Sequence, residues 1–267
     1  MLQSIQFQKE VLNMEKYYIA RPEDLDLTFD ENGFACAELL PGTYDGGIRN
    51  YMCRLKPGCS VSPEMYADKT VLFMFGFGKG YICDSETSYN INEVSFYFPN
   101  FDQCPYRIHA VEEMEFVMSV VDLNEWDKEL MAENHLYLPL FRPLGTCLRY
   151  VQDCKGQNTE ARMVLSGTQL GRIILGTTRA IGEGTKEKGH PIVHQWNYCL
   201  GNSDFNMTVD HGEPVPHKAH EWSFIPAGPD HDLVADPGKE VFYIWYEHFV
   251  REKDFSVNPM PGQKWPV

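Results

Sequence analysis

Six of the nine histidines in this 267-residue chain lie between His190 and His231. Neutral imidazole is the commonest protein ligand of divalent transition metals. Residues two or four apart on a β-strand point to the same face, so His190 and His194 are predicted to face one interior. His231, in the segment Pro226-Ala-Gly-Pro-Asp-His231, would join them from a neighbouring strand or turn. The spacing therefore predicts an open metal site made of three histidines.

Three side chains beside these histidines could complete the site or carry out its chemistry. Gln195 and Glu187 are candidates for a fourth ligand or for a hydrogen bond to a ligand, and Glu187 could also move a proton. Lys188 cannot ligate as an ammonium group, but it could pair with an anionic substrate or act as acid or base. The alternative is that Lys188 is a solvated side chain of a charged loop. The remaining histidines of the cluster are predicted to lie in an exposed loop without a metal: His211, His217 and His220.

The elements that must position these residues are predicted to be β-strands. Short apolar or alternating runs recur along the chain, separated by Gly, Pro, Asn and Asp, which is typical of an antiparallel barrel or sandwich. Only one helix is expected, around Asn124 to Asn134, because its apolar residues share one face. These residues are Leu123, Trp126, Leu130 and Met131.

The two halves of the chain resemble each other weakly. The segment Glu93-Val-Ser-Phe96, followed by Pro99, resembles Glu221-Trp-Ser-Phe224, followed by Pro226. Such a repeat predicts a duplicated β-domain. With the junction in the proline-rich stretch before residue 143, we expect an N-terminal domain over 1–140 and a C-terminal domain over 141–267. The first copy lacks the histidine trio and is expected to bind no metal, whereas the second is expected to bind one.

Composition excludes several other classes of protein. The chain has 23 basic and 38 acidic residues, a net charge of −15, which disfavours nucleic acid and anionic membranes as partners. It has no apolar run of about 18 residues that would span a membrane. The N-terminus lacks the apolar core of a signal peptide. The 8 cysteines contain no Cys-x-x-Cys pair and are interpreted as free thiols of a cytoplasmic protein.

The histidine segments resemble the paired motifs of the cupin superfamily. Gly182, Lys188-Gly-His190, His194 and Gly201 follow the spacing of the first motif, and Pro226-x-Gly228-x-x-His231 matches the second. With two domains and one metal motif, the chain is most similar to bicupins of the (S)-ureidoglycine aminohydrolase type. That resemblance implies two jelly-roll barrels in tandem and manganese in the second. The chain departs from that type at two positions, since Lys188 stands where the type has Glu and His231 where it has Gln.

Three functions remain open at this point. The first is a non-redox metalloenzyme (a hydrolase, lyase or isomerase) acting on a small polar, anionic metabolite. The second is an iron dioxygenase with three histidine ligands, and the third is a bicupin that binds a small ligand without catalysis. One divalent metal is expected, manganese first, with iron, nickel and zinc as alternatives. The expected partners are a small-molecule substrate and a second copy in a homodimer, which would bury exposed barrel edges.

Overall fold

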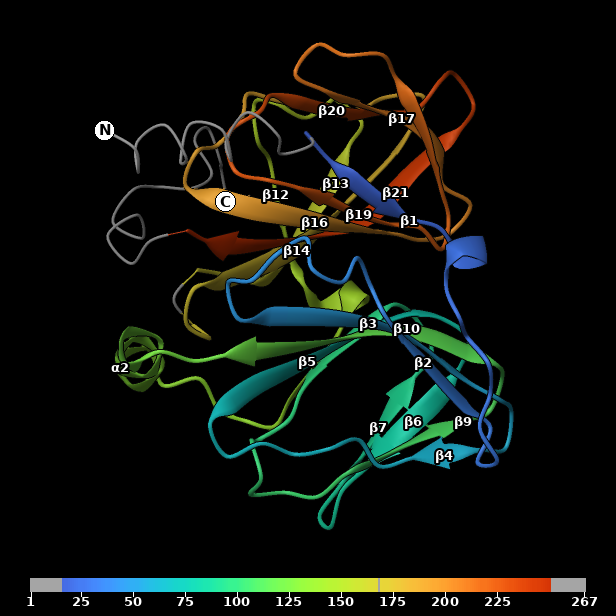
Figure 1. Ribbon diagram of the computed structural model, residues 1–267, viewed down its shortest axis with the longest axis vertical. Coiled ribbons are helices and arrows are strands. Elements are labelled where there is room, and N and C mark those ends of the chain that lie inside the picture. The colour runs from blue at the N-terminus through green and yellow to red at the C-terminus, as the bar shows by residue number, and fades with distance from the viewer. Residues whose placement is uncertain (1–15, 168, 251–267) are drawn as a thin grey trace, which may run out of the picture.

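The computed structural model describes residues 16–167 and 169–250 and is built almost entirely of antiparallel strands. Two barrels lie one above the other in Figure 1, each made of a large and a small sheet. This confirms the predicted all-β fold of two tandem barrels. Within the described residues, none of the helices has both the length and the apolar character needed to cross a bilayer.

The first barrel is formed mainly by the N-terminal half of the chain. Its large sheet has the order β11 (Leu140–Pro143), β8 (Ser95–Phe98), β5 (Lys69–Phe77), β10 (Met114–Asp122), β3 (Ile48–Leu55), β2 (Phe34–Glu38). Its small sheet has the order β4 (Ser60–Val61), β9 (Arg107–Ala110), β6 (Gly80–Cys83), β7 (Ser88–Ile91). A 3-10 turn, η1 (Pro22–Asp24), precedes it.

The second barrel repeats this plan. Its large sheet has the order β1 (Tyr18–Ala20), β19 (Trp222–Ile225), β16 (Val193–Cys199), β21 (Glu240–Phe249), β14 (Ile173–Ile181), β13 (Glu160–Leu165), β12 (Leu148–Tyr150). Its small sheet has the order β15 (Gly184–Glu187), β20 (His231–Val234), β17 (Asp204–Val209), β18 (Val215–Lys218). The 3-10 turn η2 (Leu144–Thr146) lies between β11 and β12.

The two barrels exchange one edge strand each. β1 pairs with β19 in the second barrel, and β11 pairs with β8 in the first. β8 and β19 carry the repeated segments around Phe96 and Phe224, and they occupy the same place in their sheets. The sequence repeat therefore reflects a structural repeat. The large sheet of the second barrel ends in β1, which precedes the first barrel in sequence, and the large sheet of the first barrel ends in β11, which precedes the second barrel in sequence.

The large sheets face each other and share one apolar core. Met74, Phe96 and Val117 from the first barrel lie in the same cluster as Trp196 and Phe224 from the second. Each barrel also has its own interior cluster. Because β21 is covered on both faces, all of its residues are buried, whereas β17 alternates between buried and half-buried positions. A residue on a central strand therefore faces either a barrel interior or the interface between barrels.

The predicted helix is confirmed as α2 (Glu125–Asn134), at the edge of the first barrel in Figure 1. Asn124 caps it by accepting a hydrogen bond from the Asp127 N–H at 2.8 Å. Asp127 exposes 2% of its surface and accepts bonds from the Arg172 N–H and guanidinium at 2.8–3.2 Å. This pair attaches the helix to the segment that leads into β14.

Candidate metal centre

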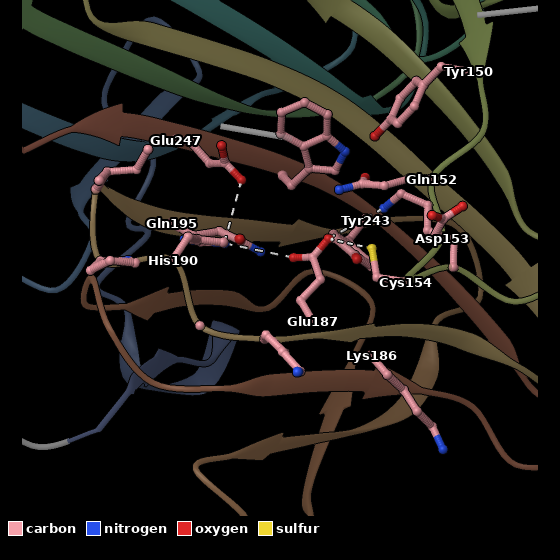
Figure 2. Close-up of a pocket in the computed structure, with 16 residues that line it drawn as sticks. Tyr150, Gln152, Asp153, Cys154, Lys186, Glu187, His190, Gln195, Tyr243 and Glu247 are labelled. Atoms are coloured by element: carbon pink, nitrogen blue, oxygen red, sulfur yellow. Dashed lines mark hydrogen bonds and ion pairs between the residues drawn. The ribbon is translucent and has the colours of Figure 1, made fainter. Parts of the chain in front are cut away.

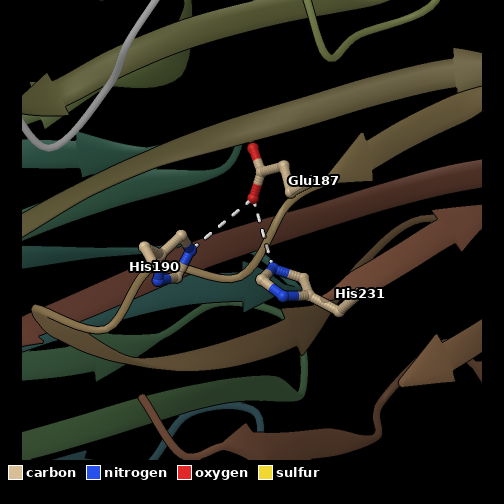
Figure 3. A group of neighbouring side chains, drawn as sticks. All are labelled: Glu187, His190 and His231. Atoms are coloured by element: carbon tan, nitrogen blue, oxygen red, sulfur yellow. Dashed lines mark ion pairs between the residues drawn. The ribbon is translucent and has the colours of Figure 1, made fainter. Parts of the chain in front are cut away.

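Glu187, His190 and His231 meet inside the second barrel, as Figure 3 shows. Glu187 is the last residue of β15 and lies opposite His231, the first residue of β20. His190 belongs to the turn between β15 and β16. One ligating atom from each of the three lies within 4.8 Å of the other two. Among the described residues this is the one group of His, Cys, Asp and Glu with such geometry.

Two turns hold this group together. The Gly189 N–H donates to Asp230 Oδ1 at 2.6 Å, which ties the turn carrying His190 to the turn that precedes His231. A Cβ atom on residue 189 would collide with the carbonyl of Gly228, so this close approach requires glycine. The position of His190 is thereby fixed by backbone contacts.

Hydrogen bonds orient two of the three ligating side chains. His231 Nδ1 lies 3.2 Å from the Pro229 carbonyl, which can only accept, so Nδ1 carries a proton and Nε2 is the atom left to bind a metal. Glu187 Oε2 lies 3.2 Å from His231 Nε2 and 3.8 Å from His190 Nε2. The other carboxylate oxygen, Oε1, accepts a bond from the Cys154 thiol at 3.2 Å. Metal-ligating histidines and carboxylates typically have such supporting partners.

The charges of the group are strongly coupled. Burial lowers the pKa of His190, but the neighbouring carboxylates of Glu187 and Glu247 outweigh this and raise it to about 9. Burial raises the pKa of Glu187, but the neighbouring imidazoles of His190 and His231 and the charge of Lys155 bring it well below its usual range. Burial raises the pKa of Glu247 to about 7, against the opposing charge of His190.

These residues fit a divalent transition metal. His190 Nε2 and His231 Nε2 are buried without a hydrogen-bond partner among the described residues, as is Glu247 Oε2. Glu247 Oε1 lies 3.9 Å from His190 Nε2, which makes Glu247 a candidate fourth donor. Two imidazoles with carboxylates suit manganese, iron and zinc better than the hard ions calcium and magnesium. A bound cation would satisfy donor atoms that are otherwise buried and unpaired.

A cavity of about 570 Å³ opens beside the group. Figure 2 shows the side chains of Glu187, Gln195 and Glu247 pointing toward the same space. Gln195 is 2% exposed and donates to Asn197 Oδ1 at 2.9 Å, while its carbonyl oxygen has no partner among the described residues. Gln195, predicted as a fourth ligand or as a partner of a ligand, thus lies at the wall of the cavity with an oxygen free to receive a bond.

His194 is not brought to this group. Its ring lies 4.9 Å from that of Tyr44 of the first barrel, and its Nδ1 accepts a bond from the Ala227 N–H at 3.1 Å. The alternation argument failed because β16 begins at Val193, so His190 lies in a turn and not on the same strand. On β16 the inward position belongs to Gln195, and His194 faces the interface between barrels. The structure thus replaces the predicted third histidine by Glu187.

Two other expectations from the sequence have different outcomes. Lys188 is exposed and lines the cavity, so the structure leaves its role as a proton donor or anion partner open. His217 was expected in an exposed loop but is fully buried on β18, with Nδ1 2.5 Å from Glu221 Oε2. That expectation was wrong because the proline-containing loop includes a paired strand. His211 is exposed, as expected.

Sequence reasoning missed Cys154, Lys155 and Glu247, which all line the cavity. The first two come from the turn between β12 and β13, far from the motif in sequence. Glu247 did leave a signal, because it is an acid within an apolar and aromatic strand, where burial is costly without a partner.

No known family profile and no curated protein sequence matches the chain. Three solved structures are similar to it. A glyoxylate-induced protein from Pseudomonas aeruginosa is 12% identical, with a TM-score of 0.71, over 89% of this chain and 90% of that one. Protein YlbA from E. coli is 10% identical, with a TM-score of 0.68, over 90% and 96%. Oxalate decarboxylase from Lactobacillus farciminis, in complex with formate, is 11% identical, with a TM-score of 0.64, over 92% and 88%. At such identities the likeness establishes the fold alone, which is that of two cupin barrels in tandem.

Proposed function

We propose that this bicupin is a cytoplasmic metalloenzyme that acts on a small anionic metabolite by non-redox chemistry, as a hydrolase, lyase or isomerase. Its second barrel would hold one divalent metal through Glu187, His190 and His231, with manganese as the first candidate. The observation that carries the proposal is the convergence of these three side chains at the wall of a cavity of about 570 Å³, with the Nε2 atoms of His190 and His231 buried and without a hydrogen-bond partner among the described residues.

The residues around the metal suggest separate tasks. A bound divalent cation would polarise a carbonyl or carboxylate oxygen of the substrate. Glu247 is suited to moving a proton, because burial raises its pKa to about 7, near the pH at which a general base works best. Gln195 would accept a hydrogen bond from the substrate. Lys188, exposed beside the cavity, would attract an anion as it enters.

The ligand set favours one alternative. Two histidines and one carboxylate with open positions are typical of non-haem Fe(II) oxygenases. The same residues could therefore hold iron and bind oxygen with the substrate. Oxygen consumption distinguishes the two functions, because the non-redox enzyme turns over at the same rate in air and under argon.

The test is metal analysis of purified protein, followed by a turnover screen of small carboxylic and ureido acids. We expect one metal per chain in the wild type and less than a tenth of that in His190→Ala and His231→Ala. His211→Ala, on an exposed histidine outside the group, is the matched control and should retain the metal. His194→Ala discriminates between the two ligand sets: metal loss there, with retention in His231→Ala, would contradict the assignment.

A further inference from the structure

Lys155 places a buried ammonium group in the wall of the cavity. Its side chain is 5% exposed, unlike the exposed Lys186 and Lys188, which line the same cavity. The backbone on both sides is fixed to β15. The Lys186 N–H donates to the Cys154 carbonyl and the Gly156 N–H to the Gly184 carbonyl, each at 2.9 Å. The ammonium is therefore held in place by the sheet rather than by a mobile loop.

The ammonium group of Lys155 does not use all of its hydrogen-bond donors. Its Nζ donates to Thr178 Oγ1 at 3.1 Å, and Glu187 Oε1 lies 3.9 Å away. An ammonium has three donors, and 3.9 Å is too long for a hydrogen bond. Buried donors without acceptors are costly, so an acceptor on a ligand in the cavity would complete the environment of Lys155.

Charge favours an anionic ligand at this place. Glu187 and an ionised Glu247 would balance the two charges of a bound divalent metal. The charge of Lys155, in a setting screened from water, would then be left without a counterion. An anion bound between the metal and Lys155 would supply it.

The other residues that line the cavity indicate the size and polarity of the uncharged part of that ligand. Pro191, Ile192 and Tyr243 give apolar walls, and Trp245 Nε1 and Gln152 Oε1 are buried without partners among the described residues. A volume of about 570 Å³ is in the usual range of small-molecule pockets, and such pockets enclose most of their ligand. An acid of two carbon atoms would leave most of this space to water.

We propose that Lys155 binds the carboxylate of the substrate, and that the substrate is a carboxylic acid with a ring-sized apolar body. This inference rests on the proposed function, because it places the acid beside the metal. It assigns anion recognition to Lys155 instead of Lys188. Lys155 would then determine which substrates bind, while Glu187, His190 and His231 hold the metal.

The test uses benzoate as a probe, with benzamide as its uncharged counterpart and oxalate as the two-carbon acid. Titration calorimetry on manganese-loaded wild type should show binding of benzoate and at least tenfold weaker binding of benzamide and oxalate. Lys155→Met should weaken benzoate at least tenfold and leave one metal per chain, and Lys155→Arg should restore part of the affinity. Lys186→Met, at an exposed lysine that lines the same cavity, is the matched control and should bind benzoate as the wild type does.

Each contrary outcome has a distinct meaning. Unchanged benzoate affinity in Lys155→Met, or a preference for oxalate in the wild type, overturns the inference. Loss of metal in Lys155→Met also overturns it, because Lys155 would then only position Glu187. If the wild type binds no metal, the proposed function fails. In that case the affinities of metal-free wild type and metal-free Lys155→Met for benzoate still decide the role of Lys155. If the wild type binds benzoate neither with nor without metal, the inference is refuted.

Discussion

Metal binding to this protein should release a proton from His190 at neutral pH. In the metal-free protein, burial lowers the pKa of His190, but the neighbouring carboxylates of Glu187 and Glu247 outweigh this and raise it to about 9. A metal binds only the neutral imidazole. Because pH 7 lies two units below this pKa, removing the proton at pH 7 costs about 3 kcal/mol, at roughly 1.4 kcal/mol per pKa unit.

The sign and size of the effect follow. Apparent affinity for manganese should rise about tenfold per pH unit from pH 7 to pH 9 and level off above pH 9. A histidine with an ordinary pKa of about 6.5 would instead give constant affinity across that range, with a fall only at lower pH. The interactions with Glu187 and Glu247 thus move the expected fall in affinity from the acid range, where a histidine of ordinary pKa would place it, to neutral pH.

Calorimetry under argon in buffers of different ionisation enthalpy measures this release directly. We expect close to one proton per manganese at pH 7.5 and almost none above pH 9.5. Glu247→Gln removes one of the charges that raise the pKa of His190, so affinity should level off at a lower pH in this variant. Equal affinities at pH 7 and pH 9, with no proton released, would refute the reasoning.

Two further predictions concern contacts of the fold outside the metal site. Asp127→Asn should lower the free energy of unfolding by about 3 kcal/mol, because it leaves the mostly buried Arg172 without its counterion. Urea unfolding measures this, and a change below about 0.5 kcal/mol would contradict the prediction. Mild peroxide should join Cys36 and Cys53, which are paired on β2 and β3 with sulfur atoms 3.5 Å apart; mass spectrometry should show the loss of two hydrogens, absent in Cys53→Ser.

Local patterns predicted the strands and the helix around Asn124 to Asn134, because these depend on neighbours in sequence. The same reasoning selected His194 wrongly, since it required knowing that β16 starts after His190. One residue of offset on a strand turns a side chain from the barrel interior to the opposite face. Gln195, next to His194, is the residue that faces the cavity.

Contacts between distant strands could not be predicted in this way. Lys155 reaches the cavity because its turn is attached to β15, and Glu247 because β21 pairs with β16 opposite Gln195. Both contacts depend on sheet order and register, which a single sequence does not show. Only the cost of burying an acid in an apolar strand could have marked Glu247 in advance.

The two barrels show why a shared fold does not produce a shared site. β4 and β9 occupy the place in the first barrel that β15 and β20 occupy in the second. In the first barrel Val61 pairs with Ile108, and both pack in the interior cluster, whereas in the second barrel Glu187 pairs with His231. Arg107 and Ser62, the next residues along these strands, are exposed, and the Arg107 Nε–H donates to Ser62 Oγ at 3.3 Å outside the barrel. Apolar side chains thus face the interior of the first barrel where the second barrel offers a carboxylate and an imidazole, so this position of the first barrel has no metal ligands although the strands that would carry them remain.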